Sequence, residues 1–274
     1  MQRVTGGDIA LVDTEAKRAT AYDCYFKFKH LDFAPPFGPL DYMEAISHCL
    51  KQGARHVIVD STTHEHSGPG GVMDQINRYL DEKCGDDFAK RDRLNMVAHK
   101  GPKADRKELN NFVIQAGRDG VNFIFCYRAD ERVKPVQGQG IQNIGMTPET
   151  TSKLVYEMMA MFLLSAAADG KPISNPATPL EKMFTKLPVQ FRDMLAAGEP
   201  LSEDLGQKLA EWARGGASKP DPIVEAMAVQ GIAKAEGGTE ALKGWWSGLS
   251  KAHQHALKDR LPEFKKIAEA KAAP

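Results

Sequence analysis

The fold is decided by two apolar runs that end in acidic residues, IALVDTE at residues 9–15 and HVIVDSTTHE at residues 56–65. Each run has the short, nearly continuous apolar character of a strand in a buried parallel sheet. Between them, residues 40–52 read as an amphipathic helix, with Tyr42 and Ile46 on one stripe. Both acidic ends are therefore expected at the carboxyl edge of one sheet, where open α/β folds bind ligands.

The alternation of strand and helix continues along the chain. A glycine-rich turn at residues 68–71 leads into a helix that carries Val72, Ile76 and Leu80 on one face. After a polar stretch, a further helix is marked by apolar residues around 109–116, and an apolar strand, VNFIFCY, follows at 121–127. This order predicts an α/β fold with a mostly parallel sheet covered on both faces.

Composition limits the classes of protein to which the chain can belong. The 274 residues hold 36 Lys and Arg against 36 Asp and Glu, so no global charge points to a polyanionic partner. The four cysteines are scattered without a C-x-x-C pair, which indicates reduced thiols rather than disulfides or zinc ligands. No apolar stretch approaches the length of a membrane span and no signal pattern is present, so we expect a cytoplasmic protein with no membrane partner.

The second half of the chain predicts a smaller domain. Residues 156–164 fit the periods of both a strand and a helix, and the turn Asp169-Gly170 with Pro172 just beyond favours a strand that enters a hairpin. A short helix is expected at 188–197. Ser202 is expected to cap the next helix. We place a core domain at 1–214, a linker at 215–222 and a small helical domain at 223–274, in which successive helices follow glycine, serine and proline stop and start signals.

The acidic strand ends suggest phosphoryl-transfer chemistry. A hydrophobic strand followed by Asp60-Ser61 is the Walker B pattern, in which the aspartate holds Mg²⁺, usually through water. Alone the pattern is weak, because many buried strands end in aspartate. Glu15 ends a second such strand, so one carboxylate can hold the metal while the other orients an attacking water.

Six blocks of the sequence, taken in order, resemble a known family. They are IALVDTEAKRATAYD, LDFAPPFGPLDYMEAI, HVIVDSTTHEHSGPGGVMD, FIFCYRADERV, IQNIGMTPETTSKLVYEMMAMFLL and LAEWARGG. Together they look like phage-type ATP-binding proteins with a RecA-like AAA, P-loop ATPase core, over most of residues 4–215. The resemblance implies the RecA fold, the cofactors ATP and Mg²⁺, a bacterial host cell, and work on DNA in recombination or replication.

The resemblance also assigns roles to residues. Glu15 matches the catalytic glutamate, Asp60 the Walker B aspartate that holds Mg²⁺, and Ser61 stands beside it in the nucleotide site. Arg128 follows the third strand, where related enzymes place a polar sensor of the γ-phosphate, and is therefore a second catalytic candidate. Arg18 and Tyr22 match family positions to which we assign no role.

One unit of the family pattern is missing. No G-x-x-x-x-G-K-[ST] loop precedes residue 9, and Asp169-Gly170-Lys171 is no substitute because it lacks the upstream glycine and the Ser or Thr. Without backbone N–H groups to cradle the β-phosphate, ATP affinity should fall severely. The absent strand would be central in the sheet, so either another packing fills the gap or the N-terminus is truncated. We expect truncation, because MQRVTGG at residues 1–7 reads as a helix end and turn.

Several local features have two readings. His64-Glu65-His66 suggests a metal pair, but loop residues two apart do not converge as i and i+4 histidines do, so loop polarity is the better interpretation, with Glu65 able to face the nucleotide. GQGIQNIGMTP at 138–148 is either a flexible DNA-engaging loop or a plain hairpin connection. Trp245-Trp246 can stack on single-stranded bases, although core packing is the favoured interpretation.

A basic segment is the candidate DNA contact. Between residues 88 and 107, seven cations face two acids, in a stretch expected between helices. A solvated loop and helix face explains the same charges equally well. The cations are Lys90, Arg91, Arg93, Lys100, Lys103, Arg106 and Lys107.

The sequence thus predicts a RecA-like core lacking its first strand and P-loop, which binds and hydrolyses ATP in DNA recombination or replication. The expected partner is DNA, and single-stranded DNA in particular, together with a homo-oligomer or a recombination or replication protein at the helical tail. The alternative is a non-hydrolysing DNA- or protein-binding accessory on the same scaffold.

Overall fold

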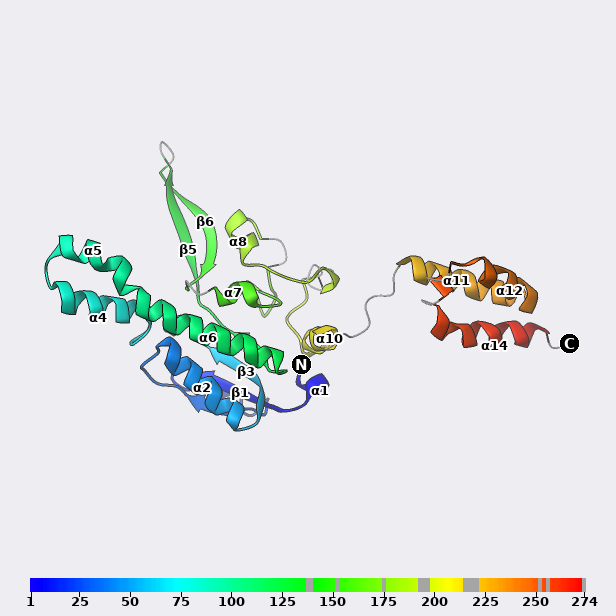
Figure 1. The fold of residues 1–274 in the computed structure, drawn as a ribbon, viewed down its shortest axis with the longest axis horizontal. Helices are drawn as coiled ribbons and strands as arrows, with labels where there is room; N and C mark the ends of the chain where they lie inside the picture. The colour runs from blue at the N-terminus through cyan, green and yellow to red at the C-terminus, as the bar shows by residue number, and fades with distance from the viewer. Residues whose placement is uncertain are drawn as a thin grey trace. The chain divides into compact units, whose positions relative to one another are not determined.

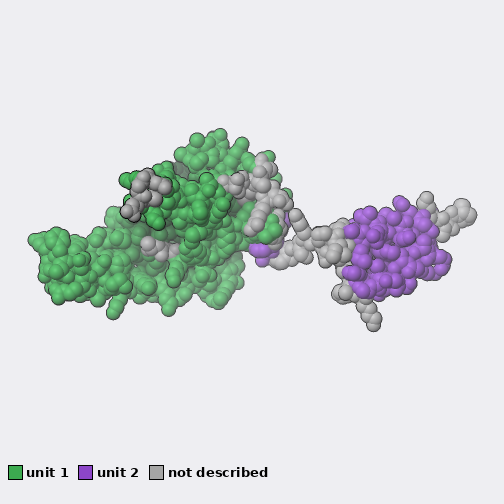
Figure 2. Space-filling model, turned by 90° about the horizontal axis from the view of Figure 1, so that it is seen from above, with its two compact units in different colours: residues 1–210 green, residues 211–274 purple. Residues whose placement is uncertain are grey.

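A computed structural model describes residues 1–136, 140–150, 153–173, 176–191, 198–213, 222–250, 253–254 and 257–272. The chain divides into two compact units, residues 1–210 and residues 211–274 (Figure 2). Most of the linker expected at 215–222 lies outside the described residues. No helix in the described part of the chain is long and apolar enough to cross a membrane.

The larger unit is built on a four-stranded parallel sheet (Figure 1). Its strands are β1 (Asp8–Asp13), β2 (Lys29–Asp32), β3 (Ala54–Asp60) and β4 (Asn122–Phe125), in the spatial order β2-β1-β3-β4. The register pairs Val12 with Val59, and Asp13 with Asp60 on β3 and Asp32 on β2. The predicted α/β fold with a parallel sheet is therefore present, and the acidic strand ends lie at one edge.

One face of the sheet is covered by α2 (Pro39–Lys51) and α6 (Lys100–Arg118), as Figure 1 shows. Alternate strand residues, Ala10, Val12, Val57 and Val59, point into a core that α2 fills with Tyr42 and Ile46 and α6 with Leu109 and Val113. The helix predicted at 40–52 is confirmed within a residue at each end.

The opposite face of the sheet is only partly covered. The short helix α1 (Gln2–Thr5) reaches it through His56, whose Nε2 lies 3.0 Å from Thr5 Oγ1 and 2.8 Å from Gly6 O. Farther along this face Ile58 is half-buried and Ile124 on β4 is 47% exposed. The prediction of a sheet covered on both faces is therefore wrong for the described residues, because the helices gather on one side.

Four helical segments follow the strands of the sheet. They are η1 (Arg18–Tyr22), α3 (Thr63–Ser67), α4 (Val72–Cys84) and α5 (Phe88–Ala98). The helices α4 and α5 form an antiparallel pair with its own small core, in which Ile76, Leu80 and Ala98 are buried (Figure 1). The stretch 88–107 is thus helical in α5 and α6, where the sequence suggested an irregular polar connection.

After β4 the chain forms the antiparallel hairpin of β5 (Ala129–Val136) and β6 (Gly140–Pro148). Of the two readings of 138–148, the hairpin holds for the described residues. Three short helices, α7 (Leu154–Glu157), α8 (Pro179–Met183) and η2 (Val189–Phe191), and then α10 (Glu203–Ala213), follow.

One expectation for this region is wrong, one lies mostly outside the described residues, and one is confirmed. The run 156–164 is not a strand, because only Met161 makes a bridge, to Lys186, while the turn at Asp169-Gly170 is present with positive φ at both residues. Its uniformly apolar character fits both periods, so it did not fix the structure. The helix expected at 188–197 lies mostly outside the described residues, whereas the Ser202 cap is confirmed by a Leu205 N–H bond to its Oγ at 3.2 Å.

The second unit is a small helical bundle of α11 (Pro222–Glu236), α12 (Thr239–Gly248), η3 (Lys258–Arg260) and α14 (Leu261–Ala272). Its core includes Leu242, Leu257 and Phe264. Trp245 packs edge-to-face on Phe264, with ring centroids 6.1 Å apart, and both tryptophans are partly buried against this core. Core packing therefore accounts for the tryptophan pair.

Candidate functional site

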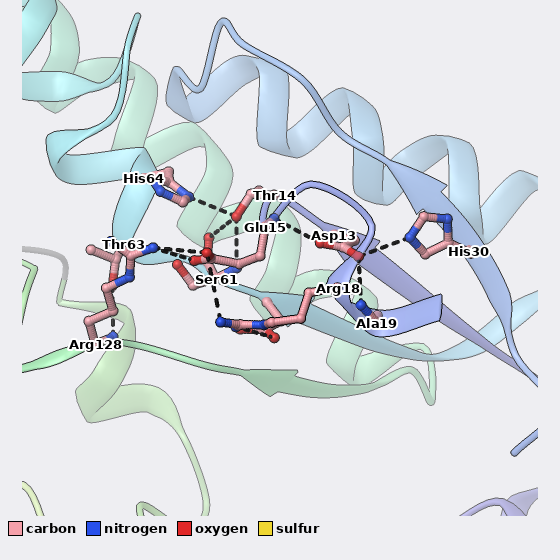
Figure 3. A network of polar contacts seen from close by, with 11 residues as sticks. Asp13, Thr14, Glu15, Arg18, Ala19, His30, Ser61, Thr63, His64 and Arg128 are labelled. Carbon is pink, nitrogen blue, oxygen red and sulfur yellow. Dashed lines mark hydrogen bonds and ion pairs between the residues drawn. The ribbon is translucent and has the colours of Figure 1, made fainter. Parts of the chain in front are cut away.

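The candidate site lies where β1, β3 and β4 end at the carboxyl edge of the sheet (Figure 3). Backbone bonds hold the three ends together, since Thr14 N donates to Asp60 O at 2.8 Å and Thr62 N to Cys126 O at 2.8 Å. The residues that follow each strand are therefore fixed side by side. This edge brings together Glu15, Asp60, Ser61 and Arg128, the four site residues predicted from the sequence.

Glu15 and Arg128 form the central ion pair of the site. Arg128 Nη2 lies 2.7 Å from Glu15 Oε1 and 2.9 Å from Oε2, and the backbone N–H of Arg128 donates to Thr63 Oγ1 at 2.8 Å. Burial alone would raise the pKa of Glu15, but the hydrogen bond and charge of Arg128, aided by Arg18, lower it below its ordinary value. Glu15 is therefore ionised at neutral pH.

Asp60 has a cation of its own. Arg18, on η1, donates to Asp60 Oδ2 at 3.1 Å and also approaches Glu15 Oε2 at 3.9 Å. Two arginines thus neutralise two carboxylates at one strand edge. Arg18, a position without an assigned role in the sequence, is part of the site.

The Asp60-Ser61 peptide bond is cis, and hydrogen bonds hold Ser61 on both its N–H and its carbonyl. Ser61 N donates to Thr14 Oγ1 at 2.8 Å, and the buried Tyr42 hydroxyl donates to Ser61 O at 2.7 Å. Thr14 Oγ1 also lies 2.7 Å from His64 Nδ1 (Figure 3). The Ser61 hydroxyl is buried without a hydrogen-bond partner among the described residues, so its bonding capacity is unused by the described fold.

Asp13 is a site residue that the sequence analysis missed. Its buried carboxylate accepts the N–H groups of Glu15 at 2.7 Å and Ala19 at 3.0 Å, and lies 3.0 Å from His30 Nε2. Burial opposes ionisation, but these bonds, that of His30 foremost, lower the pKa of Asp13. Asp13 therefore shapes the turn that presents Glu15. Its position in the sequence, two residues before Glu15, could have identified it as a site residue.

Glu65 does not face a nucleotide. It is buried on α3, and its carboxylate receives Arg106 Nε at 2.7 Å and Nη2 at 2.6 Å from α6. The expectation that Glu65 could face the nucleotide is wrong, and so is Arg106 as a DNA contact, because a buried, paired guanidinium cannot reach a phosphate. His64 and His66 lie on the helix α3 and not in the expected loop, and helical residues two apart point to different sides.

The other basic candidates lie on the surfaces of α5 and α6. Arg91 pairs with Asp81 across the α4–α5 pair, and the other five are exposed. These five are Lys90, Arg93, Lys100, Lys103 and Lys107.

The glycine-rich turn at residues 68–71 serves packing. A Cβ at Gly70 would meet Pro36 Cβ at 2.6 Å, and one at Gly71 would meet His64 O at 2.6 Å. The Gly70 N–H is already taken by Asp74 Oδ2 at 2.6 Å. This turn therefore does not act as a phosphate cradle.

The residues present suit a divalent cation only in part. The described residues contain no group of three or more His, Cys, Asp or Glu side chains placed to hold a metal ion. Asp60 and the free hydroxyl of Ser61 supply one carboxylate and one neutral oxygen. Mg²⁺ commonly takes one or two carboxylates and completes its shell with phosphate and water, so this donor set fits it when a polyphosphate is bound.

Comparison of the chain with protein-family models, with curated proteins and with solved structures found no match. The interpretation of the site therefore depends on its own geometry and chemistry.

Proposed function

We propose that the chain is a RecA-like ATPase core that acts on DNA in recombination or replication. The observation that carries the proposal is the meeting of Glu15, Asp60 and Arg128, from the ends of three neighbouring parallel strands, in one network of ion pairs. A base, a metal-holding acid and a cation at one strand edge are the groups that phosphoryl transfer needs.

In this proposal the γ-phosphate draws the two arginines away from their carboxylates. Arg128 turns from Glu15 to the phosphate oxygens, and Glu15 is freed to accept a proton from a water molecule. The water oxygen forms a bond to the γ-phosphorus while the bond to the β–γ bridging oxygen breaks, and ADP leaves with that electron pair. Until the phosphate binds, the pairing with Arg128 holds the pKa of Glu15 below its ordinary value, so the base is a carboxylate before Arg128 turns away.

Asp60 and Ser61 are the proposed holders of Mg²⁺, which would neutralise phosphate charge when it is bound with ATP. The buried, unpartnered Ser61 hydroxyl supports this assignment. Beside Arg18, the exposed rings of Tyr22, Tyr25 and Phe26 offer faces on which a purine base can stack.

Hydrolysis of MgATP by the full chain tests the proposal. We expect weak, millimolar-range binding by calorimetry, because no phosphate loop contributes, together with slow release of phosphate. Glu15→Gln should keep the binding and abolish the release, and Asp60→Asn should remove the Mg²⁺ dependence. Asp32→Asn is the matched control, since Asp32 ends β2 at the same edge but, within the described residues, forms its ion pair only with Lys17, at 3.3 Å. Equal rates in all four proteins would refute the assignment.

A second candidate function is a non-hydrolysing DNA- or protein-binding accessory. The observation that favours it is that both carboxylates are already neutralised, by Arg128 and Arg18. In an accessory these pairs would be permanent links between strand ends. Absence of phosphate release from the wild-type chain at saturating MgATP, with DNA binding retained, would select this function over the first.

A further inference from the structure

The helices α5 and α6 carry one continuous exposed face. Only His99 separates them, its backbone keeps the right-handed helical conformation, and its carbonyl accepts the Lys103 N–H at 3.1 Å (Figure 1). At about 100° per residue, residues 90, 93, 96, 100, 103 and 107 fall within an arc of about 140°. We call the side chains of Lys90, Arg93, Met96, Lys100, Lys103 and Lys107 the basic stripe.

The cations of the basic stripe are left unpaired with acids in the described part of the chain, although Arg93 Nε donates to Ala89 O at 3.2 Å within α5. Arg91 and Arg106, which point to the other side, pair with Asp81 and Glu65, whereas none of the stripe's five cations makes an ion pair within the described residues. All five are exposed. Between residues 90 and 107 the nearby acids are Asp92 and Asp105, so the stripe keeps a positive excess.

An apolar side chain lies exposed among these charges, since Met96, within the stripe, is 79% exposed. Phe88 at the start of α5 is also exposed, but at about 100° per residue it points about 140° away from Arg93 and lies outside the stripe. The packing of α5 does not need Met96, because its contacts with α4 come from Leu94 and Ala98. An apolar surface flanked by cations matches a ligand with apolar faces and a charged backbone.

We propose that the basic stripe binds single-stranded nucleic acid, with phosphates on its lysines and Arg93 and bases against Met96. The helical distance from Lys90 to Lys107 is about 26 Å, enough for several consecutive phosphates. A duplex hides its base faces and makes poor use of exposed apolar side chains, so the single strand fits better. This proposal takes from the proposed function only the expectation of a nucleic-acid partner. It does not depend on ATP hydrolysis, since no stripe residue belongs to the carboxyl-edge site.

Fluorescence anisotropy of an oligothymidine of about 30 nucleotides tests the stripe with the full chain. The double variant Lys100→Ala/Lys103→Ala should lose at least tenfold in affinity and reduce the slope of log K against log salt by about 1.4, about 0.7 for each lost phosphate contact. Lys51→Ala/Lys182→Ala, which removes two exposed lysines from α2 and α8, should stay within twofold of wild type. Met96→Ala should weaken binding without changing the salt slope.

Three results would overturn the proposal. The first is equal affinity of the stripe variant and its control. The second is binding of a duplex of the same length as tightly as the single strand. The third is a stripe variant that loses binding to phosphatidylserine vesicles but keeps its binding to DNA. Basal phosphate release is measured on the same proteins and should be unchanged in the stripe variant. A wild type that binds oligothymidine through the stripe but releases no phosphate would reject the ATPase and keep this inference.

Discussion

Two arginine–glutamate pairs in the larger unit have the same chemistry in opposite surroundings. In the pair of Arg106 with Glu65, the side chains are 11% and 2% exposed, whereas in the pair of Arg128 with Glu15 they are 54% and 13% exposed. A buried pair cannot be separated without leaving a charge in the interior. A pair at the rim can exchange its partner for a ligand, because water and phosphate can replace the carboxylate. The first pair therefore joins α3 to α6, and the second is suited to chemistry.

Breaking the buried pair should have the largest effect on stability. Glu65→Ala leaves the Arg106 guanidinium buried without its carboxylate, and we expect the free energy of unfolding to fall by about 3–5 kcal/mol. Urea unfolding followed by circular dichroism measures the loss.

The control for this prediction removes both charges. In Glu65→Leu/Arg106→Met no ion is left unpaired, so most of the stability should return, since apolar replacements of buried pairs are often neutral. If the single variant loses less than about 1 kcal/mol, or the double variant loses more than the single one, the pair is not the link that we describe.

Asp13 should give the next largest effect, and one that depends on pH. Its folded-state pKa is lowered, so its contribution is fully present above the unfolded pKa and is lost as pH falls through the folded value. Asp13→Asn should cost about 1.5–3 kcal/mol at pH 7, the range for hydrogen bonds to charged groups. Urea midpoints between pH 7 and pH 3 measure it, and the variant should show a flatter acid limb than wild type. Parallel curves for the two proteins would contradict this role.

The elements with strong periodicity were predictable from the sequence, and those without it were not. The strands β1, β3 and β4 and the helix α2 follow their apolar patterns. The strand β2 reads KHLD, without an apolar run, and the β5 segment ADERVKPV is mostly polar, so neither shows the signal of a buried strand. These strands form through pairing with neighbours, which composition does not record.

The acids of the site were predictable and their partners were not. Parallel strands place their carboxyl ends at one edge of the sheet, so the sequence predicted that Glu15 and Asp60 lie close together. The pairing of Arg18 with Asp60 joins residues 42 positions apart through an irregular turn, which local patterns do not encode. The burial of Arg106, in contrast, was predictable, because it lies on the same face of α6 as the buried Leu109 and Val113. A count of the charges between residues 88 and 107 does not distinguish it from the exposed cations.

The hydrogen bond of Tyr42 is a second buried interaction of the larger unit, and removing it should have a smaller effect. Its hydroxyl donates to Ser61 O from within the core, and burial raises its pKa above the ordinary value, so it stays neutral. Tyr42→Phe keeps the ring and should cost about 0.5–1.5 kcal/mol, because Thr14 Oγ1 still reaches the same carbonyl at 3.2 Å. Thermal unfolding at pH 7 measures it. Ile46→Val causes a similar loss of stability in the same helix but away from Ser61, so it is the control for general loosening of α2. This control should leave phosphate release unchanged.

Arg128→Ala should have the smallest effect on stability, although it is central to the proposed chemistry. An exposed ion pair contributes about 0–1 kcal/mol, since water replaces the lost partner, so the urea midpoint should stay close to that of wild type. Phosphate release at millimolar MgATP should nevertheless fall at least tenfold, because the cation that meets the γ-phosphate is gone. A double-mutant cycle with Glu15→Gln separates the two roles. Coupling of more than about 1.5 kcal/mol in unfolding, without any coupling in hydrolysis, would make the rim pair a structural link like the buried one, and the contrast between the two pairs would then be wrong.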